Sequence, residues 1–347
     1  MRHAEGPGAF SSTGVIKRQV FVMKRLIVTG GAGFIGSALV HRLNNEGVDD
    51  ILIVDALAEN EKWKNLVGLR YRDYLHKDVF FRKVFTDTLD FEPQALVHMG
   101  ACSQTTMRDA DYLMENNYRY TQVLAHWAVA RGIRFIYASS AATYGSGNEG
   151  FSDDVDLHVL RPLNRYGYSK HLFDLHADRS GLFDKITGLK FFNVFGPNEY
   201  HKGDMTSVVF KAFHQIKQTG RLKLFKSHRE DYMDGEQMRD FVYVKDCVEV
   251  IWWLLKHESV DGLFNLGTGV ARTWNDLAKA LFNTMDSPPL IDYVEIPEAL
   301  RGSYQYFTQA AMERLEKAGC PIVFRPLEEA VRDYILNHLA TDNPYLH

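Results

Sequence analysis

The chain has 347 residues, 46% of them hydrophobic and 24% charged, with a formal net charge of −4. This length buries a core without disulfides or metals. Three scattered cysteines without a C-x-x-C pair favour a reducing compartment, the cytoplasm, over a disulfide framework. The negative net charge provides no broad positive surface for nucleic acid, and no apolar run is long enough to span a bilayer. We therefore expect no nucleic-acid, membrane or metal partner.

The regular pattern of the sequence begins after a tail of residues 1–22. This tail lacks the continuous apolar region of a secretory signal, and Met23 is an alternative start that the sequence leaves open. From Lys24 onward, the run RLIVT, a glycine turn, an amphipathic stretch and the run DILIVD follow one another. This order predicts a β-α-β unit.

Further apolar runs continue the alternation along the chain. They cover residues 95–100, 134–140 and 188–196, with helical patterns at 109–131 and 165–180. We therefore predict an α/β fold, a Rossmann-type doubly wound parallel sheet over residues 23–196. The pattern after residue 196 is less regular, with a charged segment at 226–240, short strands near 241–244 and 263–267, and a helix from Leu327. Residues 197–347 are predicted to form mainly a smaller substrate-binding lobe, with the chain crossing back to the sheet.

The first glycine turn carries a dinucleotide-binding pattern. Gly30, Gly33 and Gly36 stand between a predicted strand and a predicted helix. Glycines in this place allow a tight turn and close approach of the backbone to a pyrophosphate, which the following helix N-terminus attracts. Asp55 ends the next strand, where a carboxylate holds a ribose hydroxyl. The sequence therefore predicts a nicotinamide dinucleotide cofactor.

The choice between NAD and NADP stays open in the sequence. Asp55 favours NAD, because a carboxylate repels a ribose phosphate. Lys62 and Lys77 lie downstream and neutralise such a phosphate if their loops fold over the adenosine end of the cofactor.

A catalytic group is predicted at the start of the 165–180 helix. Tyr166 and Lys170 are four residues apart and share one face of this helix. A phenol with a pKa near ~10 is a poor base, but a nearby ammonium favours the phenolate. Ser140 ends a central strand, where ligands bind in this architecture, and we expect it to polarise the reacting oxygen.

These motifs, with FFNVFGP at 191–197 and RDFVYVKD at 239–246, resemble the extended short-chain dehydrogenase/reductases that act on sugar nucleotides. More narrowly, GACSQTT, ENNYRYT, FGPNEYHKG and SYQYFTQA resemble the ADP-L-glycero-D-manno-heptose 6-epimerase family. The resemblance covers the chain from Met23 onward. It implies a homo-oligomeric epimerase that oxidises C6 of the heptose with tightly bound NADP and returns the hydride to the other face, for lipopolysaccharide core synthesis.

The resemblance also implies a role for individual residues. Lys202, in HKG, becomes a second acid/base opposite Tyr166, because inversion needs proton transfer on both faces of the carbon. The implied cofactor residues are Gly30, Gly33, Phe34, Ile35, Gly36, Asp55, Ala56, Lys62, Lys77, Met99, Gly100, Ala101, Cys102, Ser103, Asn116, Lys170 and Val194. The implied substrate residues are Asn193, Phe225, Arg239 and Tyr304, together with Asp204 and Lys211.

Arg239 has a physical reason for its place in this set. A guanidinium suits a diphosphate, and its rival role is a surface salt bridge with Glu236 or Asp240. Asp204 and Lys211 replace the small hydroxyl residue and the histidine that the family leads us to expect. These two departures, and a 226–238 segment longer than in the family, lie at the substrate end. They leave open which sugar and which nucleotide base the protein binds.

Other functions remain as alternatives. Ala141 and Ala142 follow the strand-end hydroxyl where a 4,6-dehydratase needs an acidic pair, which disfavours elimination. A UDP-hexose 4-epimerase shares Tyr166 and Lys170 and is the next hypothesis. A non-catalytic dinucleotide sensor has no use for Tyr166, Lys170 and Ser140 together, and turnover would distinguish it.

Overall fold

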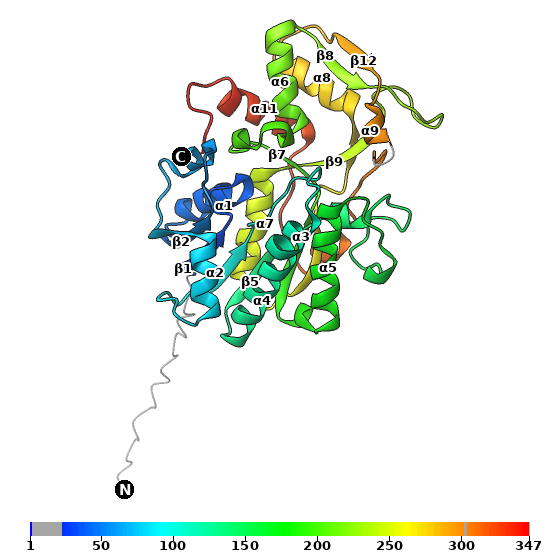
Figure 1. The fold of residues 1–347 in the computed structure, drawn as a ribbon. Helices are drawn as coiled ribbons and strands as arrows, with labels where there is room; N and C mark the ends of the chain where they lie inside the picture. The colour runs from blue at the N-terminus through cyan, green and yellow to red at the C-terminus, as the bar shows by residue number, and fades with distance from the viewer. Residues whose placement is uncertain (2–22, 302–303, 347) are drawn as a thin grey trace.

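The computed structural model describes residue 1 and residues 23–301 and 304–346. Apart from residue 1, the predicted tail 1–22 lies outside the described residues. The described part of the chain forms a large lobe around a parallel sheet and a smaller lobe above its carboxyl edge (Figure 1). None of its helices is long and apolar enough to cross a membrane.

The large lobe is built on one parallel sheet of seven strands, in the order β10-β6-β5-β4-β1-β2-β3. The strands are β1 (Arg25–Thr29), β2 (Asp50–Asp55), β3 (Asp73–His76), β4 (Ala95–His98), β5 (Arg134–Ser140), β6 (Ile186–Phe191) and β10 (Gly262–Leu266). The order reverses between β1 and β4, which is the switch point where ligands bind in doubly wound sheets.

Helices cover both faces of this sheet (Figure 1). They are α1 (Phe34–Asn45), α2 (Lys77–Phe85), α3 (Ala110–Leu113), α4 (Tyr120–Ala130), α5 (Arg165–Arg179), α7 (Val244–Lys256) and α10 (Glu313–Lys317). A π-helical segment, η2 (Met114–Arg119), joins α3 to α4. Short 3₁₀ helices lie at η1 (Glu61–Leu66), η3 (Ala141–Tyr144), η4 (Leu157–Val159) and η5 (Leu182–Asp184).

The apolar strands of the sheet are buried because helices exclude water from both faces. The side chains of Leu26, Ile27 and Val28 in β1 are fully buried, as are Phe135 and Ile136 in β5. A parallel sheet of this kind needs continuous apolar runs rather than alternation. The same burial fixes the strand ends, which carry the polar residues of the site.

The smaller lobe has its own core. Its elements are η6 (Tyr200–Met205), α6 (Val208–Thr219), β8 (Leu222–Phe225), α8 (Trp274–Thr284), β12 (Ile291–Val294), α9 (Glu298–Arg301), α11 (Leu327–Tyr334) and the π-helical η7 (Ile335–Leu339). β12 pairs with β8, and a sheet of β11 (Ala271–Thr273), β9 (Met238–Tyr243) and β7 (Asn193–Phe195) lies between the lobes (Figure 1). Buried side chains of α6, α8 and α11 form a hydrophobic cluster separate from that of the large lobe.

The structure confirms the predicted fold class. The apolar run at 188–196 covers parts of two strands, β6 and β7, which lie in different sheets. The strand near 263–267 is β10, which extends the parallel sheet beside β6, so the chain does cross back after residue 196. The helical pattern at 109–131 is interrupted by the π-helical η2, which the apolar spacing did not reveal. The division of the chain at residue 196 into two domains remains a prediction.

The separate core of the small lobe gives a stability prediction. Leu281 in α8 is fully buried in that core, whereas Leu336 in η7 is 47% exposed. We expect Leu281→Ala to lower the free energy of unfolding by about 2–5 kcal/mol, because it leaves a cavity. Leu336→Ala is the matched control and is expected to cost well under that. Equal losses in denaturant unfolding would contradict the assignment of this core.

Candidate active site

The turn between β1 and α1 brings three backbone segments into close contact. Gly30 has φ +66° and its amide donates to the Val54 carbonyl at 2.7 Å. A Cβ on Gly30 would lie 2.6 Å from the Gly100 nitrogen, and one on Gly36 would lie 2.1 Å from the Gly30 oxygen. Only glycine fits here, so the turn, α1 and the loop after β4 pack without side chains between them.

The N-terminus of α1 faces the same place with free amides. Gly33 is the cap residue of α1 and has no side chain that could bond the first amides of the helix. The first amides of α1, from Phe34 and Ile35, therefore form the positive end of the helix dipole beside the glycine turn. This arrangement suits a pyrophosphate.

A cavity of about 420 Å³ opens beside this turn, a volume in the range of small-molecule sites. Many of the predicted cofactor residues line it: Gly30, Asp55, Ala56, Lys62, Lys77, Gly100, Ala101, Cys102, Ser103 and Asn116. Gly33, Gly36, Phe34, Ile35 and Met99 belong to the adjoining turn, helix and loop, and Val194 lies in β7. The carboxyl ends of β1, β2 and β4 meet at this cavity, as the parallel sheet requires.

Asp55 is held by both backbone and side chain. Its carboxylate accepts from the Ala32 amide at 2.9 Å and the Ala56 amide at 2.7 Å. The Lys62 ammonium donates to the same carboxylate at 2.6 Å. Lys62 therefore neutralises Asp55 at the wall of the cavity.

The second predicted lysine approaches the cavity from another strand. Lys77 follows β3 and its ammonium donates to the Asn116 amide oxygen at 2.7 Å. Asn116 and its neighbour Asn117 both lie in the π-helical η2. Asn117 contacts the backbone of Cys102 and the Ser169 hydroxyl, so the wider helical turn places both amides at the site.

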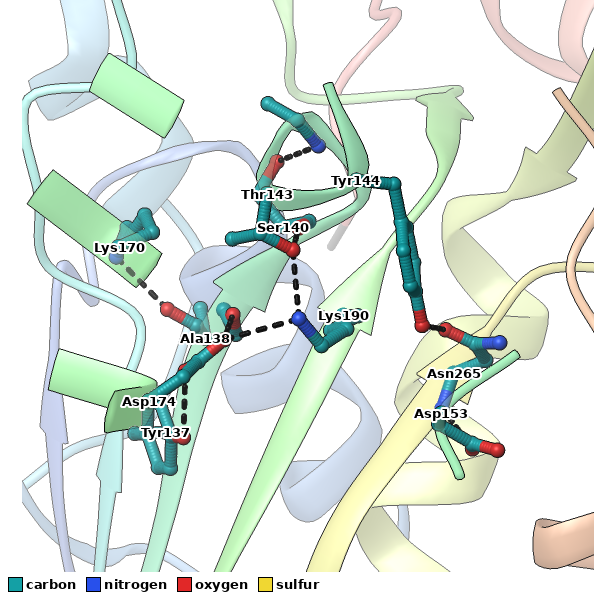
Figure 2. Close-up of polar contacts among 12 residues, drawn as sticks. Tyr137, Ala138, Ser140, Thr143, Tyr144, Asp153, Lys170, Asp174, Lys190 and Asn265 are labelled. Carbon is teal, nitrogen blue, oxygen red and sulfur yellow. Dashed lines mark hydrogen bonds and ion pairs between the residues drawn. The ribbon is translucent and has the colours of Figure 1, made fainter. Parts of the chain in front are cut away.

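The structure brings Tyr166, Lys170 and Ser140 together where β5 ends beside α5. Burial raises the pKa of the Tyr166 phenol, and a hydrogen bond with Ser140 partly opposes this. The Lys170 ammonium donates to the Ala138 carbonyl at 2.7 Å (Figure 2). Burial lowers the pKa of Lys170 to about 8, and the negative charge of Asp174 opposes this lowering.

Lys202 approaches from the small-lobe side and lines the cofactor cavity. Its ammonium lies 5.2 Å from the centre of the Phe34 ring. Burial lowers the pKa of Lys202, Glu199 raises it and Lys211 lowers it further. Glu199 is fully buried and accepts from the Ser207 hydroxyl at 2.7 Å. This hydrogen bond joins the two residues that flank the Lys202 loop.

A second cluster forms at β9, beneath the small lobe. The guanidinium of Arg239 is buried against the rings of Trp274 and Tyr304, at 5.7 and 5.3 Å from their centres. Trp274 donates to the Tyr304 hydroxyl at 3.0 Å, and Phe225 packs edge-on against Tyr304 at 6.1 Å. The predicted substrate residues Phe225, Arg239 and Tyr304 therefore do lie together.

Arg239 has no ion-pair partner among the described residues. Its guanidinium donates to backbone carbonyls of Met238 and Gln305, and burial lowers its pKa. Asp240, the rival partner, accepts instead from Thr268 and from the backbone of the loop after β10. The surface salt bridge considered from the sequence is therefore wrong, and the charge remains available to an anion.

The other predicted substrate residues lie elsewhere. Asn193 is exposed in β7, where Thr308 reaches it at 3.5 Å. Asp204 and Lys211 are exposed, and the Lys211 ammonium donates to the Asp204 carbonyl at 2.5 Å. No hydrogen bond or ion pair within the described ranges joins them to the Arg239 cluster, so their substrate role stays a prediction.

Sequence reasoning missed several residues of the site. His201, Tyr112, Tyr120, Gln104 and Met107 line the cavity, and Trp274 completes the Arg239 cluster. The position of His201 next to Lys202 in the sequence could have indicated that it lies at the site. Trp274 gave none, because its contact with Arg239 depends on the antiparallel pairing of β11 with β9.

The comparisons with known proteins agree with this geometry. The model of the NAD dependent epimerase/dehydratase family matches residues 26–267. The chain therefore belongs to this family of enzymes, which use a nicotinamide dinucleotide.

Individual relatives define the place of the chain within the family. It is 59% identical to the ADP-L-glycero-D-manno-heptose-6-epimerase of Nitratidesulfovibrio vulgaris strain DP4, over 92% of this chain and 99% of the relative. It is 46% identical to the enzyme of the same name from Fusobacterium nucleatum, over 92% of this chain and 100% of that protein. The crystal structure of the Helicobacter pylori enzyme of this name superposes with a TM-score of 0.76 at 26% identity, covering 91% of this chain and 96% of that one. The chain is a member of the ADP-L-glycero-D-manno-heptose-6-epimerases.

The buried charge of Lys170 gives a prediction for stability. Its pKa falls from 10.5 to about 8 on folding, so the unfolded chain binds more protons between these values. Stability should therefore rise by about 3 kcal/mol as the pH increases through this window, and the cost of the charge is fully present at pH 7. We expect Lys170→Met to raise the free energy of unfolding at pH 7 by about 1–3 kcal/mol.

The control for this prediction is Lys185→Met, which changes an exposed lysine of the same lobe. Denaturant unfolding of both variants at neutral and alkaline pH checks the result. A loss of stability in Lys170→Met at pH 7 would show that packing, not charge burial, dominates at this position.

Proposed function

We propose that this enzyme inverts C6 of the heptose in ADP-D-glycero-D-manno-heptose and so forms ADP-L-glycero-D-manno-heptose, a precursor of the lipopolysaccharide core. The observation that carries this proposal is the position of Lys202. This lysine is a second proton-transfer group on the wall of the cofactor cavity, on a different element from Tyr166. Inversion at one carbon needs such a group on each face.

When bound, a nicotinamide would supply the hydride acceptor and donor. Tyr166 Oη takes the proton of the substrate hydroxyl while Ser140 Oγ hydrogen-bonds the reacting oxygen. Lys170 favours the phenolate through its positive charge and holds ribose hydroxyls. The contact between Ser140 and Tyr166, and the burial of Lys170, support these roles.

Lys202 serves the opposite face of the same carbon. A lysine exchanges protons near neutral pH only when its pKa is lowered. Burial and the positive charge of Lys211 both act in this direction on Lys202. This gives Lys211, which replaces the expected histidine, a function through Lys202.

Arg239 binds the diphosphate of the substrate. It is buried, lacks an acidic partner within the described residues and lies against two aromatic rings. A guanidinium fork donates two parallel hydrogen bonds to phosphate oxygens. Phe225 and Tyr304 complete an aromatic wall for the nucleoside.

NADP is the proposed cofactor, although Asp55 alone would favour NAD. Lys62 neutralises the Asp55 carboxylate, and Lys77 lines the same cavity. A ribose phosphate entering there meets two ammonium groups instead of an unpaired carboxylate. We place this homo-oligomeric enzyme in the cytoplasm: the compartment rests on its free cysteines, and the oligomeric state rests on the family alone.

The epimerase proposal is tested with the purified protein and ADP-D-glycero-D-manno-heptose, without added cofactor. We expect the L-glycero epimer to accumulate, followed at C6 by NMR. Tyr166→Phe and Lys202→Met should each lower turnover by about 10²–10⁴-fold, because each removes one proton-transfer group.

Neighbouring residues of the same type serve as controls. Tyr168, on α5, is 49% exposed, and Lys211, close to Lys202, is exposed too. Tyr168→Phe should leave turnover unchanged, and Lys211→Met should reduce it much less than Lys202→Met. Inversion of a UDP-hexose at C4 instead would support the hexose epimerase alternative. A folded protein that binds dinucleotide without any turnover would support the sensor.

The cofactor proposal is tested at Lys62. We expect Lys62→Ala to weaken NADP binding by about 10–100-fold, because Asp55 then repels the ribose phosphate, and to change NAD binding little. Lys64→Ala is the control, because Lys64 lies in the same 3₁₀ helix and pairs with Glu61. Calorimetric titration of each variant measures both affinities. Equal loss of NAD and NADP binding would argue against a role in selectivity.

A further inference from the structure

A buried ion pair lies behind the proposed catalytic residues. Asp174 in α5 and Lys190 in β6 are both fully buried, and their charged atoms are 3.1 Å apart (Figure 2). The desolvation of two charges offsets much of their attraction, so such a pair is weak evidence for stability alone. Its contacts connect it to the active site instead.

Asp174 joins the catalytic helix to the central strand. It lies one turn after Lys170 on α5. The Tyr137 hydroxyl donates to its carboxylate at 2.8 Å and the Ser139 hydroxyl at 2.7 Å. Both donors come from β5, the strand that ends at Ser140. Asp174 therefore fixes α5 against the strand end.

Lys190 reaches the strand end from the other side. Its ammonium donates to the Thr143 hydroxyl at 2.6 Å, and that hydroxyl donates to the Ser140 carbonyl at 2.8 Å. The ammonium also lies 4.7 Å from the centre of the Tyr144 ring. Lys190 is thus connected to the backbone of Ser140 through one hydroxyl group.

The charge of Asp174 acts on the catalytic groups. The negative charge of Asp174 raises the pKa of Lys170 and also that of Tyr166. The titratable and charged groups that face the pair or Lys170 are Tyr137, Tyr144, Asp153, Tyr166, His171, His98 and Cys102. Burial lowers the pKa of His98 to about 3, so it is neutral at the working pH.

We propose that Asp174 and Lys190 are positioning residues of the epimerase, which hold Lys170 on α5 and Ser140 at the end of β5 in place for Tyr166. This inference rests on the proposed function, because it assigns roles relative to those three residues. Neither residue contacts the cofactor cavity, and each acts through the groups that it holds.

The test is a titration of the Tyr166 phenol in the complete protein with oxidised NADP. Its phenolate is followed by ultraviolet difference absorbance, and each protein is compared with its own Tyr166→Phe form. Asp174→Asn removes an anion, so the midpoint should fall by about one pH unit. Lys190→Gln leaves the Asp174 charge without its partner, so the midpoint should rise, and Lys190→Arg should restore the original value.

The matched control is Asp261→Asn. Arg134 and Asp261 form another partly buried ion pair, at the opposite end of β5 from Ser140. This control should lower thermal stability without moving the phenol midpoint. Midpoints in Asp174→Asn and Lys190→Gln that move no more than in the control would overturn the proposal and leave the pair a purely structural role.

The design of the titration and one further variant keep the outcome decisive. The titration needs no sugar, so a protein that fails to epimerise the heptose contradicts the proposed function and leaves this test intact. If the charge variants do not fold, Thr143→Val breaks the connection to Ser140 without burying an unpaired charge. It should lower kcat by about tenfold with KM unchanged. An unchanged kcat would overturn the positioning role.

Discussion

Close backbone contact between the turn after β1 and the loop after β4 is the constraint on which the site depends. Gly30 and Gly100 approach so closely that no side chain fits between them. This contact lets the N-terminus of α1 and the ends of β1, β2 and β4 share one cavity. Asp55, Lys62 and the Cys102 loop surround that cavity because these strand ends are fixed in register.

Several cationic side chains of the proposed site are buried or half-buried. Lys170 and Arg239 are almost fully buried, and burial lowers the pKa of both side chains. Lys202 shows the same effect on the wall of the cavity. These groups lie at different ends of a site whose proposed substrate and cofactor are polyanions. Bound polyanions would add negative charge beside each of these cations.

The sequence predicted those parts of the fold and site that depend on local patterns. Gly30, Gly36 and Asp55 are close in the chain, and Tyr166 and Lys170 share one helix turn, so their spacing was informative. Trp274 and the Asp174 partner Lys190 were not found, because their contacts depend on strand pairing between distant segments. The resemblance supplied Lys202 and Arg239, and the structure then gave each a physical environment. Asp204 illustrates the limit, since no local pattern shows what an exposed carboxylate contacts.

The π-helical segment between α3 and α4 has a further consequence. Asn116 contacts Lys77 at the cofactor cavity, while the adjacent Asn117 faces Cys102 and Ser169. A wider helical turn accommodates one more residue than a regular α-helix would. Removing one residue would make the helix more regular, yet it would rotate every later side chain of α4 relative to α3 by about 100°. The length of this segment therefore sets the direction of every side chain that follows it in α4.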